Sequence, residues 1–166
     1  MNQTESLQTI KRASAIGLWG SVGVVVSTAF FLLVSPYRFA MQTDYTRRWM
    51  LVAGTVLAVL AVSMALLAVR RQVPVIRQTE GMAAKLGAYA QYVKSLFYSM
   101  LAVVVVVCLL AVVSSQKVLL MLAMVATLVL FLAYPNMYRM KVELGLSDEE
   151  MRSLFGDKYI GSDGQQ

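Results

Sequence analysis

The stretch LFYSMLAVVVVVCLLAVV, at residues 96–113, contains no Asp, Glu, Lys or Arg and is almost entirely apolar. A helix needs about 20 such residues to cross a hydrocarbon core of about 30 Å. Similar stretches lie at residues 13–34, 50–69 and 118–133, and every charged residue of the chain lies outside the four. The sequence therefore predicts an all-α membrane protein in which four transmembrane helices form two hairpins.

The composition agrees with this class. The 166-residue chain is 58% hydrophobic, with a mean hydropathy of +0.65, whereas soluble domains are about 45–50% apolar. Four spans use most of the length, so we expect one transmembrane domain over residues 1–146. The first stretch is longer than a signal-peptide core and no small-residue cleavage site follows it, so we interpret it as a retained helix.

The basic residues predict the orientation. Short loops rich in Lys and Arg stay in the cytoplasm, and eleven of the fifteen basic residues flank the same side of the predicted spans. We therefore expect a multi-pass protein of a cell membrane with both termini cytoplasmic. The chain resembles small bacterial four-span proteins in its organisation, which implies the bacterial inner membrane. The net charge of +6 then reflects orientation, and we expect no nucleic-acid partner.

The connection between the second and third stretches has helical character of its own. Pro74 should end or kink the second helix near Val73. After Gly81, apolar residues recur in alternating steps of four and three, which is typical of an amphipathic helix. This apolar stripe comprises Met82, Leu86, Tyr89, Val93 and Leu96. We predict one continuous helix from near Met82 to Val113, whose first part projects beyond the membrane.

The stripe must cover something. The candidates are the N-terminal arm with Leu7 and Ile10, a tail helix, the lipid interface or another protein, and we favour the two partners within the chain. The tail helix is predicted within residues 147–156, because Ser147 and Glu150 form a capping box and Gly156 is a stop signal. Residues 157–166 are expected to be disordered.

Small residues lie at close helical spacing in the first stretch, around Gly17 and Ser21, and in the second, at Gly54 and Ala58. Close backbone approach drives helix association in lipid. We favour packing of these two spans against each other over a dimerisation face. The two halves also look like a duplicated helical hairpin, although four-span periodicity alone would produce the same pattern.

The sequence contains no recognisable catalytic group. There is no His, and the single Cys108 lies among valines, where a packing role is expected. No span carries a charge, so a proton-coupled carrier such as a small multidrug antiporter is excluded. We expect a protein that is not an enzyme and that binds no cofactor or metal.

Three hypotheses remain. The first is a non-enzymatic accessory or scaffold subunit that acts through helix packing and a cytoplasmic amphipathic helix, with a membrane protein or a second copy as partner. The second is a small transporter or channel for neutral or lipid-like solutes. A lipid-directed enzyme using Asp44 has least support. Five basic residues could contact anionic lipid, or could only set the topology: Arg70, Arg71, Arg77, Lys85 and Lys94.

Overall fold

The computed structural model describes residues 3–34 and 44–156, and all its regular elements in these residues are helices. The expectations for residues 35–43 and for the tail 157–166 lie outside the described residues. The six helices are α1 (Gln3–Val34), α2 (Asp44–Gln78), α3 (Met82–Ser114), α4 (Lys117–Leu132), α5 (Met137–Leu144) and α6 (Asp148–Phe155). The predicted all-α class is confirmed.

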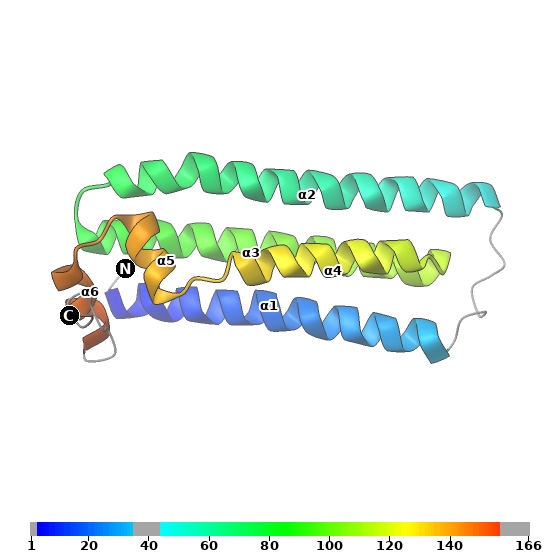
Figure 1. The fold of residues 1–166 in the computed structure, drawn as a ribbon, viewed down its shortest axis with the longest axis horizontal. Helices are drawn as coiled ribbons and strands as arrows, with labels where there is room; N and C mark the ends of the chain where they lie inside the picture. Colours follow the sequence, from blue (N-terminus) through cyan, green and yellow to red (C-terminus); the bar gives the residue numbers. More distant parts are fainter. Residues whose placement is uncertain (1–2, 35–43, 157–166) are drawn as a thin grey trace, which may run out of the picture.

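The bundle is built around α3, which buries far more of its residues than α2 or α4. Helices α1 and α2 lie on opposite sides of α3 and α4, and α5 and α6 lie at the end of the bundle where α1 begins (Figure 1). We call this the capped end. The turn that joins α2 to α3 is also at the capped end, so the four long helices run alternately up and down.

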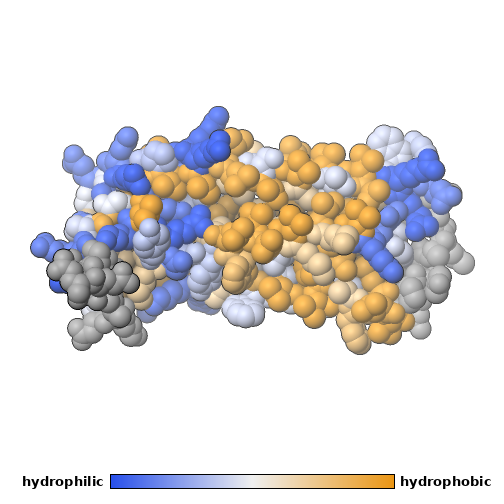
Figure 2. Space-filling view, viewed as in Figure 1, coloured by the Kyte–Doolittle hydropathy of each residue, from blue (hydrophilic) through white to orange (hydrophobic). Residues whose placement is uncertain are grey.

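The middle of the bundle has an apolar surface, between hydrophilic ends (Figure 2). Helices α1, α2 and α3 are each long and apolar enough to cross a membrane. Helix α4 has only 16 residues, about 24 Å at 1.5 Å per residue, and reaches the length of a span only together with α5, from which it is bent by 74°. The chain thus has three candidate spans, or four if this bent pair is counted as one.

The small residues of α1 pack inside the chain, as we favoured, but against a different helix. A Cβ atom added at Gly17 would lie 2.7 Å from the Cβ of Phe97 in α3. On α2, one at Gly54 would lie 2.6 Å from Leu119 in α4. The prediction that the first two spans pack against each other is therefore wrong, because α3 and α4 lie between them and both glycines face that central pair.

Of the two outcomes predicted for Pro74, an end or a kink near Val73, the end is wrong, because α2 continues through Pro74 to Gln78. A proline within a helix removes one backbone hydrogen bond and costs about 3 kcal/mol. Contacts beyond the proline offset this cost. Ile76 is buried in the core, and the guanidinium of Arg77 donates a hydrogen bond to the carbonyl oxygen of Val142 in α5.

The N-terminal arm is part of a helix, since α1 begins at Gln3 rather than near Ala13. Helix α1 packs mainly on α3, and Ile10 in its N-terminal part is buried. Buried hydroxyls on this face are satisfied within the helix: Ser14 donates to the carbonyl of Ile10 and Ser21 to that of Gly17, at 2.8 and 2.7 Å. Such bonds let a polar side chain lie inside a bundle without an unpaired group.

Helix α3 begins at Met82, as predicted, and α6 has the predicted capping box of Ser147 and Glu150. Helix α5 was not predicted. The side chain of Asn136 accepts a hydrogen bond from the backbone of Arg139 at its start, and Gly145 ends it with a φ of 63°. An Asn N-cap and a glycine eight residues after the first helical position were the available signals.

Candidate functional site

The apolar stripe of α3 is covered within the chain. Leu86, Tyr89, Val93 and Leu96 are each at most 8% exposed, and Met82 is partly buried. They belong to a buried cluster that runs through the whole bundle and also contains Ile10 of α1, Met140 and Leu144 of the unpredicted α5, and Met151 of α6. The stripe is thus largely buried inside the chain.

A polar cluster joins α3 to α5 in this core. The hydroxyl of Tyr89 donates a hydrogen bond to a carboxylate oxygen of Glu143, at 2.6 Å. The other oxygen of Glu143 accepts from Nε of Arg139 at 2.5 Å, and Arg139 also donates to the carbonyl of Leu132 at the end of α4. Three helices are therefore fixed by one carboxylate and its two donors.

The environment keeps the phenol of Tyr89 protonated. Burial is the main cause that raises its pKa, and the neighbouring negative charge of Glu143 raises it further. Glu143 accepts from both a guanidinium and a phenol, and hydrogen bonds that involve a charged group are stronger than neutral ones. This arrangement suits a structural connection, since an activated nucleophile would need a free base beside it.

Arginines recur at the ends of helices. Arg139 of α5 donates to the carbonyl of Leu132 at the end of α4, and Arg77 of α2 donates to that of Val142 near the end of α5. In the same way, Nε of Arg47 in α2 donates to the carbonyl of Ser114 at the end of α3, at 3.3 Å. The last carbonyls of a helix lack partners within the helix, and a cation there is favourable. Some of the basic residues that we used to predict orientation thus have a structural task as well.

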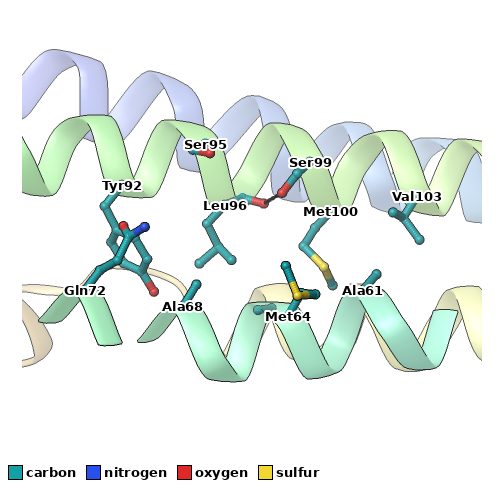
Figure 3. Close-up of a pocket in the computed structure, with 11 residues that line it drawn as sticks. Ala61, Met64, Ala68, Gln72, Tyr92, Ser95, Leu96, Ser99, Met100 and Val103 are labelled. Carbon is teal, nitrogen blue, oxygen red and sulfur yellow. Dashed lines mark hydrogen bonds between the residues drawn. The ribbon is translucent and has the colours of Figure 1, made fainter. Parts of the chain in front are cut away.

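A groove runs between α2 and α3 and consists of two adjoining cavities. The first, of about 290 Å³, lies between Ala61, Met64 and Ala68 of α2 and Leu96, Met100 and Val103 of α3 (Figure 3). The second, of about 390 Å³, lies nearer the capped end. Gln72, Tyr92 and Ser95 border both cavities. The groove is therefore apolar in the middle of the bundle and polar towards the capped end.

A third cavity, of about 200 Å³, lies on the other side of α2 and is bordered by Val69, Leu130 and Arg139, among others. Leu96, Met100 and Ala65 separate it from the groove, because they border both spaces. Helix α2 is thus flanked by empty space on two sides over the same turns. Ala65 is the residue of α2 that borders both spaces, and it is buried between them.

The five basic residues proposed as lipid contacts are in different positions. Arg71 is exposed and borders the second cavity of the groove. Arg77 is engaged with α5. Arg70 and Lys94 are exposed and Lys85 is partly buried, and none of these borders the three cavities described above. Of the five, Arg71 alone borders one of the three cavities described above, beside two glutamines and a tyrosine that the sequence analysis did not single out.

Within the described residues, no group of three or more His, Cys, Asp or Glu side chains is placed to hold a metal ion. Cys108 is buried in α3. Comparisons with models of known protein families, with curated proteins and with solved structures give no match. The candidate site is therefore identified from its geometry alone. It is a groove with an apolar interior and a polar, basic mouth.

Proposed function

We propose that this chain is a four-span integral membrane protein with both termini in the cytoplasm, and that it is a non-enzymatic accessory or scaffold subunit. It acts through helix packing, and α2 is the helix that it presents to a partner within the membrane. The partner is another membrane protein or a second copy of the chain.

The poor packing of α2 is the observation that carries this proposal. Only Gly54, Ala58, Ala65 and Ile76 of its 35 residues are buried, against thirteen of the 33 residues in α3. Large side chains such as Val59 and Met64 are exposed along its length. The amphipathic stripe of α3, on the cytoplasmic helix through which we expected the protein to act, is already covered inside the chain. We therefore assign the contact with a partner to α2, a helix within the membrane.

Ser63 adds a polar reason for a partner on α2. It lies in the middle of the apolar segment and is exposed, and within the described part of the chain its hydroxyl forms no hydrogen bond. By contrast, the hydroxyl of Thr55 on the same helix donates to the carbonyl of Leu51 at 2.8 Å. A hydroxyl at membrane depth gains from a hydrogen bond across a helix interface.

Photocrosslinking in the native membrane tests the proposal. A photoreactive residue at Val59 of α2 should give one discrete product, whereas one at Leu128 of α4 should not. The two positions are matched, since they are 55% and 57% exposed. A product of twice the mass identifies a second copy as partner. Equal labelling at both positions, or labelling at Leu128 alone, would contradict the role of α2.

The orientation is tested separately. The capped end contains the start of α1, the α2–α3 turn, α5 and α6 (Figure 1), which supports placing both termini on one side. Reporter fusions after Asp44 and after Gly81 should report the outside and the inside respectively. The reverse pattern would reject this topology.

A second candidate is a small transporter of neutral or lipid-like solutes without proton coupling. The lateral groove between α2 and α3 favours it, because it opens to the surface and passes from apolar to polar surroundings. Proteoliposomes should then show solute flux that does not respond to an imposed pH gradient. Flux driven by such a gradient, absent from empty liposomes, would exclude this mechanism.

A further inference from the structure

We propose that the groove between α2 and α3 is a binding site for one anionic phospholipid of the surrounding bilayer. One acyl chain lies in the apolar cavity, the phosphate lies beside Arg71, and the hydroxyl of Tyr92 donates a hydrogen bond to the ester or phosphate oxygens between them. This site depends on the membrane insertion proposed above, but it does not depend on any protein partner.

The apolar cavity has the length of a lipid chain. From Ala61 to Gln72, α2 rises about 16 Å, close to half of a hydrocarbon core of about 30 Å. Along this distance α2 turns alanines at 61, 65 and 68 towards the cavity, while Leu96 and Met100 form the opposite wall (Figure 3). The small side chains leave the space, and its depth matches one leaflet.

The volume of the cavity favours a chain over a helix. A partner helix is about 10 Å across, so roughly 1,000 Å³ or more would be needed to seat 16 Å of it inside the groove. The apolar cavity provides about 290 Å³. A flexible hydrocarbon chain fills such a space, whereas a helix could only lie over its opening.

Tyr92 supplies a polar group that lacks a partner. The residue is only 7% exposed, yet within the described residues its hydroxyl makes no hydrogen bond. It borders both cavities, and its ring extends from α3 towards Gln72 on α2 (Figure 3). Buried hydroxyls in proteins nearly always have a hydrogen-bond partner. An acceptor oxygen of a bound molecule at this junction would provide it.

The charge at the mouth selects an anion. Arg71 forms no ion pair with any acid in the described part of the chain, and Gln72 and Gln91 beside it offer further donors. No acid borders either cavity. Glu143, whose charge acts on Tyr92, is already paired with Arg139. A phosphate satisfies this arrangement, whereas the added cation of a zwitterionic headgroup would reduce the attraction to Arg71.

Native mass spectrometry of the full-length protein in detergent tests the site. Dioleoyl phosphatidylglycerol and dioleoyl phosphatidylcholine are added separately at matched concentrations. We expect one tightly held phosphatidylglycerol per chain and weaker binding of phosphatidylcholine. Arg71→Gln should weaken phosphatidylglycerol binding about fivefold. The matched control is Arg70→Gln, which removes a neighbouring exposed charge outside the groove and should have little effect.

Two further variants separate the chain from the headgroup. Tyr92→Phe keeps the volume and removes only the hydroxyl, so it should weaken binding two- to tenfold without changing the fold. Ala68→Phe should fill the cavity and lower the binding of both lipids, with an unchanged circular dichroism spectrum as the folding control. Equal binding of the two lipids, equal effects of Arg71→Gln and Arg70→Gln, or wild-type binding by Tyr92→Phe would overturn the proposal. Each of these results leaves the crosslinking test of α2 unaffected.

Discussion

The contact between α1 and α3 at Gly17 can be tested with a single methyl group. A Cβ atom at this position would lie 2.7 Å from Cβ and 3.1 Å from the carbonyl oxygen of Phe97. Non-bonded carbon atoms normally stay about 3.5–4.0 Å apart. Neither atom of Phe97 can move by a side-chain rotation, so Gly17→Ala must push the two helices apart by about 1 Å.

Gly23→Ala provides the matched control, because no atom lies within 4 Å of a Cβ added at Gly23 in the same helix. Alanine is favoured over glycine in a helix by about 1 kcal/mol, and this gain is common to both variants. Overpacking costs about 1–3 kcal/mol. We therefore expect Gly17→Ala to be less stable than Gly23→Ala by about 1–3 kcal/mol. Gly54→Ala should lie between them, since it meets the movable end of Leu119.

Unfolding by sodium dodecyl sulfate in mixed micelles, followed by far-ultraviolet circular dichroism, measures these differences. The order of stability should be Gly23→Ala, then Gly54→Ala, then Gly17→Ala. If Gly17→Ala and Gly23→Ala unfold at the same detergent fraction, α1 does not approach α3 at Gly17, and the central place of α3 in the bundle would have to be abandoned.

Three further predictions concern the interior of the bundle. Leu86→Asp should lower the free energy of unfolding by roughly 1–3 kcal/mol, because it buries an unpaired polar group. The control Ala84→Asp, on the exposed side of the helix, should change this free energy little. Equal melting temperatures of the two variants would refute the burial of the stripe. Cys108→Ala should cost about 1 kcal/mol through a small cavity and leave function intact, and loss of function in a folded variant would show a chemical role. Burial and Glu143 raise the pKa of Tyr89 above its ordinary value of about 10, so the unfolded chain loses this proton at a lower pH than the fold does. The contribution of Tyr89 to the free energy of unfolding is therefore fully present below about pH 10 and falls above it. Between about pH 9 and 11, Tyr89→Phe should lose less stability than the unchanged protein, as measured by chemical unfolding. Identical losses in the two proteins would argue against a buried phenol.

The elements that the sequence predicted correctly have local signals. Helix α3 begins at Met82 because Gly81 precedes an uninterrupted apolar periodicity, and α6 begins after Ser147 because its side chain and that of Glu150 cap each other. The apolar stretches depend on composition over about 20 residues. Such signals act between neighbours along the chain, so they can be read without knowing which helices meet.

The partners of each helix were decided by the tertiary structure. The small residues around Gly17 require a close neighbour, but any helix could supply it, and the fold supplies α3 rather than α2. Pro74 remains inside α2 because Ile76 and Arg77 are held by distant parts of the chain. These contacts join residues far apart in sequence, and a local pattern carries no information about them.

The candidate site divides in the same way. The sequence determined that the chain has long apolar helices with basic residues at their ends, because burial in lipid excludes charge from the spans. It could not single out Arg71 among five similar residues, nor recognise that Tyr92 borders a groove. Those facts depend on the small side chains of α2 facing α3, whose residues border the groove with them. The groove exists only where these two helices, far apart along the chain in many of their residues, lie side by side.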